Sequence, residues 1–193
     1  MKNDIILAGV GGQGILSIAT IIGTAAVKAG LFVKQAEVHG MSQRGGDVQS
    51  HLRLSGREIA SDLIPAGKAD MIISVEPMES LRYLPMLKPD GWLITNTKPF
   101  VNISNYPPIA DVMAEIEHFE NHIALDADQI AAGLGAAKSA NMVILGAASP
   151  FIDIPFDELE DAIRTIFGRK GEDVVNTNLE ALRAGRTFTA EHR

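Results

Sequence analysis

The chain has 193 residues, of which 46% are apolar and 21% are charged, a composition typical of one globular domain with a sizeable core. The formal net charge of −7 argues against nucleic acid as a partner, and the lack of cysteine excludes disulfides, thiolate-held iron–sulfur clusters and a cysteine nucleophile. No apolar run approaches the roughly 18 residues that cross a bilayer, and residues 1–4 lead straight into a core strand, so we expect a cytoplasmic protein with no membrane partner and no cleavable signal.

A glycine-rich turn near the amino terminus is the first element with a functional signature. Residues 5–8 are an apolar run typical of a strand buried on both faces, and apolar residues recur at helical spacing over about 15–29. The glycines between them match the G-x-G-x-x-G spacing, which allows a tight turn, close approach of an anion to the backbone, and close helix–strand packing. The free N–H groups and the helix dipole predict an anion site. The turn consists of Gly9, Val10, Gly11, Gly12, Gln13 and Gly14.

A second strand and a second glycine-containing loop follow. Gly30 is placed to end the helix, and the next strand is expected over 31–37. The segment 39–46, with glycines near both ends, is typical of an exposed loop. Alternating apolar and polar residues over 48–54 predict a half-exposed strand, with 58–60 returning as a short hairpin partner. We therefore expect a small antiparallel insertion.

The rest of the chain alternates strands with helices. Strands are expected over 71–75, 92–95 and 123–125, and helices over 77–87, 110–117, 126–134, 136–145, 156–167 and 173–184. A turn is expected at 88–91, a loop at 96–108, and Gly185 is placed to end the last helix before a frayed polar tail at 186–193. The alternation predicts a single α/β domain over residues 1–185, with a Rossmann-like, doubly wound, mostly parallel sheet and the small antiparallel insertion.

The glycine turn by itself leaves several ligands open. No Lys-Ser/Thr pair follows Gly14, which excludes a Walker-type phosphate loop. A dinucleotide site needs an acid at the end of the second strand, and Glu37 lies 23 residues past Gly14, in roughly the expected place. The adjacent Gly11 and Gly12 are also similar to the loops of adenylating enzymes that activate ubiquitin-like carboxylates. A tight strand–helix turn that binds nothing is the structural alternative.

The loop at 39–46 holds a second candidate binding element. Its arginine is a permanent cation with five donors beside two glycines that let a ligand or partner approach, although an exposed loop arginine without a ligand is the alternative. The residues concerned are Gln43, Arg44, Gly45 and Gly46. His118 and His122 stand four apart without a third ligand, so no metal site is expected. No Ser/His/Asp order or nucleophile elbow assigns a catalytic residue to this chain.

Together the two glycine elements resemble a known family. The stretches 9–14 and 37–46 are similar to the gamma domain of the 2-oxoacid:ferredoxin oxidoreductases, and within it to the branch that acts on arylpyruvates such as indolepyruvate. The Gly-Gly-Gln-Gly and Arg-Gly-Gly elements together are far more specific than either alone. The resemblance covers nearly the whole chain, with further matching stretches at 50–53, 69–70, 76–82, 141–146 and 178–185.

The resemblance implies one subunit of a two-subunit enzyme, inactive without its partner. Such an enzyme oxidatively decarboxylates a 2-oxoacid with coenzyme A and ferredoxin, while thiamine diphosphate and iron–sulfur clusters belong to the larger alpha subunit. The lack of cysteine fits that division. The glycine turn and residues 43–46 would then bind coenzyme A. Two alternatives stay open: a ligand-free scaffold subunit, and a free-standing NAD(P)-dependent dehydrogenase that uses Gly9, Gly11, Gly14 and Glu37.

Overall fold

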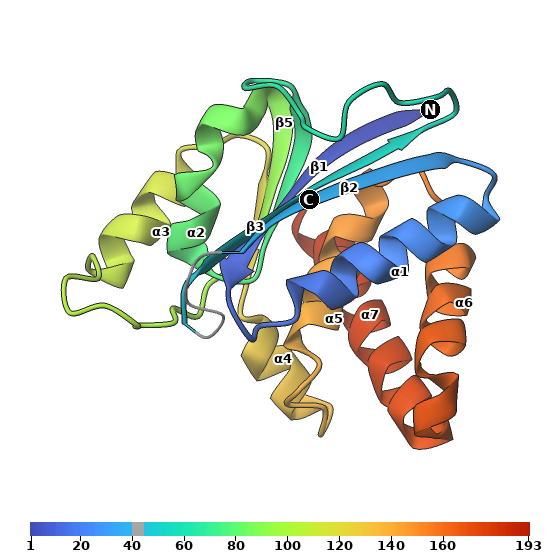
Figure 1. The fold of residues 1–193 in the computed structure, drawn as a ribbon. Coiled ribbons are helices and arrows are strands. Elements are labelled where there is room, and N and C mark those ends of the chain that lie inside the picture. The colour runs from blue at the N-terminus through green and yellow to red at the C-terminus, as the bar shows by residue number, and fades with distance from the viewer. Residues whose placement is uncertain (40–44) are drawn as a thin grey trace.

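The computed structural model describes residues 1–39 and 45–193, which form a six-stranded sheet with helices on both faces (Figure 1). The sheet has the order β2-β3-β1-β4-β5-β6. Strand β3 is antiparallel to both of its neighbours, and the other five strands run in one direction. The strands are β1 (Lys2–Val10), β2 (Phe32–His39), β3 (Asp47–Ser55), β4 (Ala69–Ser74), β5 (Leu87–Asn96) and β6 (His122–Leu125). The predicted doubly wound, mostly parallel α/β fold is confirmed.

Successive side chains of a strand point to opposite faces, so one strand feeds two hydrophobic cores. In β1, Ile5 and Leu7 join the larger core, and Ile6 joins the smaller one. The larger core lies under α1, α5, α6 and α7, and the smaller lies under α2 and α3, as Figure 1 shows. The helices are α1 (Ile15–Lys28), α2 (Pro77–Arg82), α3 (Ile109–Glu117), α4 (Ala127–Gly133), α5 (Ala140–Ala148), α6 (Phe156–Phe167) and α7 (Glu172–His192), with 3-10 turns η1 (Leu84–Met86), η2 (Ser149–Phe151) and η3 (Gly168–Lys170).

The antiparallel strand lies inside the sheet, and the predicted hairpin partner at 58–60 is wrong. Both sides of β3 are already hydrogen-bonded, to β1 and to β2, so no edge is left for residues 58–60. The segment 56–68 instead runs without a strand and is held by Arg53, whose Nη1 donates to the carbonyls of Ser61 (2.9 Å) and Leu63 (3.0 Å).

The helix predicted over 77–87 stops at Arg82. Pro85 has no N–H to continue a helix, and a 3-10 turn takes the place of the last helical turn. Residues 88–91, where a turn is expected, lie within β5. The pairing of β5 with β4 shifts register there, between the pairs Ala69–Leu87 and Met71–Trp92. The helix expected from 136 begins only at Ala140.

The last helix does not end at Gly185, and residues 186–192 are helical instead of a frayed tail. Gly185 serves a close crossing of α7 over α5: a Cβ on it would lie 1.9 Å from the carbonyl oxygen of Val143. A Cβ on Gly146 would lie 1.9 Å from the carbonyl oxygen of Leu182. The glycine therefore permits contact between two helices, and the buried Thr189 shows that α7 packs well beyond it.

Two further observations concern a metal site and a membrane-spanning helix. His118 follows the last residue of α3 and His122 begins β6, so the two histidines do not share a helix face. Across residues 1–39 and 45–193, the side chains form no cluster of three or more potential metal ligands. Within the same residues, no helix has the length and apolar character needed to cross a bilayer.

Candidate functional site

The glycine turn joins the carboxyl end of β1 to α1. Gly12 and Gly14 both have positive φ, of 102° and 82°, and Gly14 is the N-cap residue directly before α1. The side chain of Gln13 braces the turn, because its Oε1 accepts from the N–H of Val10 at 2.7 Å. Gly9 lies against Val75, whose Cγ2 would be 2.4 Å from an added Cβ. The turn therefore depends on close approach at one end and on left-handed backbone at the other.

The two glycine elements found in the sequence lie together. The N–H of Gly11 donates to the carbonyl of Gly46 at 2.9 Å, and the N–H of Gly45 donates to the carbonyl of Gly11 at 3.4 Å. Gln43 and Arg44, also predicted to belong to the site, lie outside the described residues. The structure thus brings the carboxyl-terminal end of the second element onto the glycine turn.

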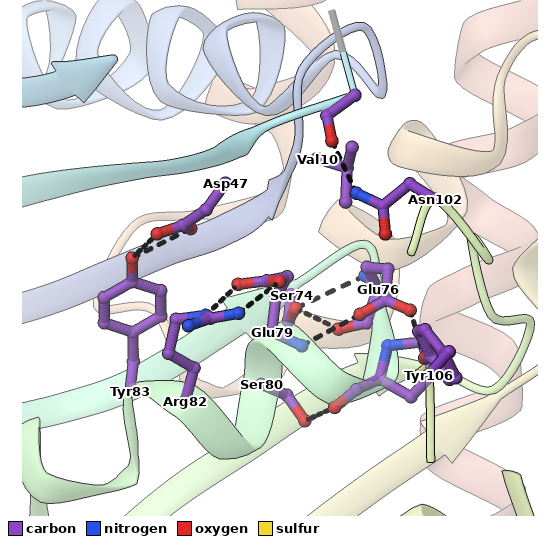
Figure 2. A network of polar contacts seen from close by, with 12 residues as sticks. Val10, Asp47, Ser74, Glu76, Glu79, Ser80, Arg82, Tyr83, Asn102 and Tyr106 are labelled. Atoms are coloured by element: carbon purple, nitrogen blue, oxygen red, sulfur yellow. Dashed lines mark hydrogen bonds and ion pairs between the residues drawn. The ribbon is translucent and has the colours of Figure 1, made fainter. Parts of the chain in front are cut away.

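A third segment, the loop 97–106, reaches the same place. The side-chain amide of Asn102 donates to the carbonyl of Gly45 (Figure 2). The loop is tethered from below by Glu76, whose Oε1 accepts from the N–H of Phe100 at 3.2 Å and from the hydroxyl of Tyr106. The other carboxylate oxygen accepts from the N–H of Glu79 at 2.8 Å, at the start of α2. Glu76 is fully buried, so this carboxylate organises the loop from inside the fold.

A second polar group lies beside it, at the start of β3 (Figure 2). The hydroxyl of Tyr83 donates to the carboxylate of Asp47 at 2.7 Å, and Nε of Arg82 donates to Glu79 at 2.6 Å. Burial raises the pKa of Tyr83, and the hydrogen bond to Asp47 raises it further, which keeps the hydroxyl protonated as a donor. Burial also raises the pKa of Glu79, against the opposing effect of Arg82. The hydrogen bond from Tyr83 fixes the side chain of Asp47, the residue that follows Gly46 in the chain.

A pocket of about 370 Å³ opens beside the glycine turn at the carboxyl ends of β1, β4 and β5. In the sheet β1 lies between β3 and β4, and the chain passes from β1 through α1 to β2 on one side and later builds β4, β5 and β6 on the other. The carboxyl ends of β1 and β4 are therefore the point where the strand order reverses, the usual ligand position in open α/β sheets. The amide of Asn141 donates to the carbonyl of Gly14 at 3.1 Å and so joins α5 to the turn. The pocket is lined by Gly12, Gln13, Gly14, Ser17, Val75, Asn96, Asp128, Ala137, Lys138, Ala140, Asn141 and Ile144.

The acid of a dinucleotide site is not beside this turn. Glu37 pairs with Ser50 of β3, which in turn pairs with Leu7 of β1. With strands about 4.8 Å apart, Glu37 lies two strands, or roughly 10 Å, to the side of β1, and level with a residue before the turn. Its Oε1 accepts a hydrogen bond from Gln35. In a dinucleotide fold the second strand pairs with the first, whereas here β3 separates them. The spacing of 23 residues between Gly14 and Glu37 therefore does not place the carboxylate beside the glycine turn.

Comparison of the sequence with known proteins shows which family the chain belongs to. The family model for pyruvate ferredoxin/flavodoxin oxidoreductase matches residues 4–188. The chain belongs to this family. It is 36% identical over 194 residues to the indolepyruvate oxidoreductase subunit IorB of Archaeoglobus fulgidus, covering 96% of this chain and 94% of that protein. The resemblance predicted from the two glycine elements is therefore confirmed.

Two solved structures share the fold of this chain. The 2-oxoglutarate:ferredoxin oxidoreductase from Magnetococcus marinus, with 2-oxoglutarate, coenzyme A and succinyl-CoA bound, has a TM-score of 0.79 at 26% identity. The match covers 98% of this chain but spans only 31% of that one. The keto/oxoacid ferredoxin oxidoreductase gamma subunit from Geobacter sulfurreducens has a TM-score of 0.71 at 23% identity, with 98% and 99% of the two chains covered.

Several residues around the site had no role in the sequence interpretation. Glu76 and Asn141 stand in stretches that match the family, but a match of letters does not show which backbone groups a side chain meets. Asn96 follows the apolar strand 92–95, and a polar residue at the carboxyl end of a parallel strand is the signal by which it is recognisable. Asn102 and Lys138 lie in polar segments that carry no such signal.

Proposed function

We propose that this chain is the beta, gamma-type subunit of a cytoplasmic arylpyruvate:ferredoxin oxidoreductase with indolepyruvate as a substrate. Its similarity to IorB over 96% of the chain carries the proposal. The enzyme would convert the 2-oxoacid and coenzyme A to an acyl-CoA and carbon dioxide while ferredoxin accepts the electrons. The chain acts as one domain in complex with a larger alpha subunit.

The role of this subunit is to bind and orient coenzyme A. Supporting this, the similar 2-oxoglutarate:ferredoxin oxidoreductase from Magnetococcus marinus has coenzyme A bound, and the pocket here lies at the strand-order reversal. Backbone N–H groups at the start of α1 and the positive end of its dipole suit a diphosphate. The proposed binding residues are Gly9, Gly11, Gly12, Gln13, Gly14, Gln43, Arg44, Gly45 and Gly46. Of these, Gly9 and Gln13 shape the turn, and Gly12, Gln13 and Gly14 line the pocket.

The iron–sulfur clusters that the family implies do not fit this chain. It has no cysteine, so it offers no thiolate to an iron–sulfur cluster. We assign the clusters and thiamine diphosphate to the alpha subunit, together with the electron transfer to ferredoxin. The residues of this chain supply binding and orientation, and no catalytic residue is assigned to it.

The purified chain is expected to have no oxidoreductase activity, and addition of the alpha subunit is expected to restore it. The measurement is reduction of ferredoxin, or of a dye that replaces it, with indolepyruvate and coenzyme A. The alpha subunit alone serves as the control and is expected to be far less active than the mixture. Turnover by this chain in the absence of its partner would contradict the division of roles.

The nicotinamide alternative predicts a different ligand preference. Because Glu37 is two strands away from the turn, we expect NAD and NADP to bind in the millimolar range or weaker, equivalent to about −4 kcal/mol. Coenzyme A should bind the assembled complex far more tightly, as measured by calorimetry. Micromolar binding of NAD that is abolished in Glu37→Ala would favour a dehydrogenase, and absence of coenzyme A binding to the complex would favour a scaffold subunit.

A further inference from the structure

A second hollow adjoins the pocket at the glycine turn. It has a volume of about 440 Å³ and lies between the first turns of α1, α5 and α7, which cover the same face of the sheet in Figure 1. The two hollows share Ser17, Lys138 and Asn141 in their linings, so they are adjacent sections of one groove. Each has the volume of a small-molecule site.

The groove carries one lysine that lines both hollows and another that lines only the second. Lys138 lines both hollows, and Lys170, from the 3-10 turn before α7, lines only the second. Both side chains are exposed, and neither forms an ion pair with any residue in the described part of the chain. Nζ of Lys170 lies 5.2 Å from the centre of the Phe167 ring. Two cations along one groove suit a ligand with two separated phosphate groups.

The walls of the second hollow combine apolar and polar surface. Met142, Phe167 and Val174 offer an apolar lining for a planar base, and hydroxyl and amide groups of α5 and α7 lie beside them. One carboxylate, from Asp173, also lines this hollow. A lining that combines apolar surface, polar groups and two lysines suits a base and a ribose flanked by phosphates.

The geometry points to a subsite for the adenosine 3′-phosphate end of coenzyme A in the second hollow, with Lys170 on the 3′-phosphate and Lys138 on the diphosphate between the two hollows. In coenzyme A the 5′-diphosphate and the 3′-phosphate flank one ribose, so a ligand whose diphosphate lies near the glycine turn presents its 3′-phosphate further along the groove. This inference rests on the proposed function. It assigns the selectivity for coenzyme A over nucleotides that lack the 3′-phosphate to a residue outside both glycine elements.

The test compares coenzyme A with dephospho-coenzyme A, which differs only in the 3′-phosphate. Calorimetric titrations use the complex of this chain with its alpha subunit, without 2-oxoacid or ferredoxin. The wild-type complex is expected to bind coenzyme A at least about tenfold more tightly than the dephospho form, because a hydrogen bond to a charged group contributes on this scale. Lys170→Ala should abolish this preference and Lys170→Arg should largely retain it, while Lys138→Ala should weaken binding of both ligands and keep the preference.

Lys68→Ala is the matched control, an exposed lysine at the opposite, amino-terminal end of β4. It is expected to leave both affinities unchanged. If the wild-type complex binds coenzyme A but Lys170→Ala keeps the preference for it, the subsite assignment is wrong and the proposed function stands. If the wild-type complex does not bind coenzyme A, the proposed function itself fails. Unchanged melting temperatures of the lysine variants show that the fold is intact.

Discussion

Gly146→Ala is expected to lower the melting temperature of the chain by roughly 6–12 °C, because the added methyl group separates two packed helices. Its Cβ would lie 1.9 Å from the carbonyl oxygen of Leu182, where a backbone group cannot move aside as a flexible side chain can. Overpacking of this kind costs about 3 kcal/mol of unfolding free energy, at the upper end of the usual range. Gly185→Ala is expected to have a similar effect, since its Cβ would meet Val143 from the other side of the same crossing.

Gly168→Ala provides the matched control for this prediction. Gly168 has helical backbone angles, φ −53° and ψ −35°, and an added Cβ would meet nothing within 4 Å. Because alanine loses less conformational entropy than glycine on folding, this variant should be neutral or slightly more stable. Thermal unfolding followed by circular dichroism gives both values. Equal melting temperatures for Gly146→Ala and Gly168→Ala would show that the helices adjust without cost.

The same crossing also positions the site. Helix α5 carries Asn141, which donates to the carbonyl of Gly14, and it begins two residues after Lys138. A shift of α5 away from α7 therefore moves both groups relative to the glycine turn. We infer that the close packing of these two glycines, Gly146 in the second half of α5 and Gly185 in the second half of α7, contributes to ligand geometry as well as to stability.

Glu76→Ala is expected to lower the unfolding free energy by about 2–4 kcal/mol and to weaken binding of coenzyme A by the complex. The substitution leaves three buried or half-buried donors without their acceptor: the N–H groups of Glu79 and Phe100 and the hydroxyl of Tyr106. Each buried donor that loses its partner costs on the order of 1–3 kcal/mol, and part of this cost is relieved where water can enter. The loop 97–106 then loses its tether, so Asn102 no longer holds the carbonyl of Gly45.

A graded series separates this network from a general loss of charge. Tyr106→Phe removes one of the three hydrogen bonds and should cost about 1 kcal/mol, and Glu76→Gln, which keeps one acceptor oxygen, should fall between it and Glu76→Ala. Glu58→Ala removes an exposed carboxylate and should change stability by less than roughly 0.5 kcal/mol. Urea unfolding and the Michaelis constant for coenzyme A are the two measurements. If Glu76→Ala is as stable as Glu58→Ala, the buried carboxylate does not organise the loop.

Elements whose signals are local could be predicted closely from the sequence. The first strand, the glycine turn and α1 follow one another over residues 2–28, and the apolar spacing that predicts the helix is the spacing that the larger core buries. The helix Phe156–Phe167 was likewise predicted at its bounds. The two glycine elements together also identified the family, since short motifs require no knowledge of contacts, and the lack of cysteine fits the division of roles between its subunits.

Contacts between distant segments could be decided only by the tertiary structure. Residues 58–60 have the local pattern of a hairpin partner, but both edges of β3 are already hydrogen-bonded, one to β1 and the other to β2. Gly185 has the local pattern of a helix stop, but α7 continues past it. Its lack of a side chain lets the backbone of α5 approach closely. The local pattern of residues indicates which secondary structure a segment favours, whereas strand order and helix crossings depend on partners elsewhere in the chain.

The candidate site divides in the same way. The sequence alone determined that a strand, a glycine turn and a helix open the chain and that a second glycine element accompanies them. Only the tertiary structure placed β3 between Glu37 and the turn, tethered Asn102 to Gly45, and brought Asn141 to Gly14 across 127 positions of sequence. The physical reason is that a hydrogen bond requires two groups within about 3 Å, and for groups far apart in sequence this distance is set by the packing of the sheet and its helices.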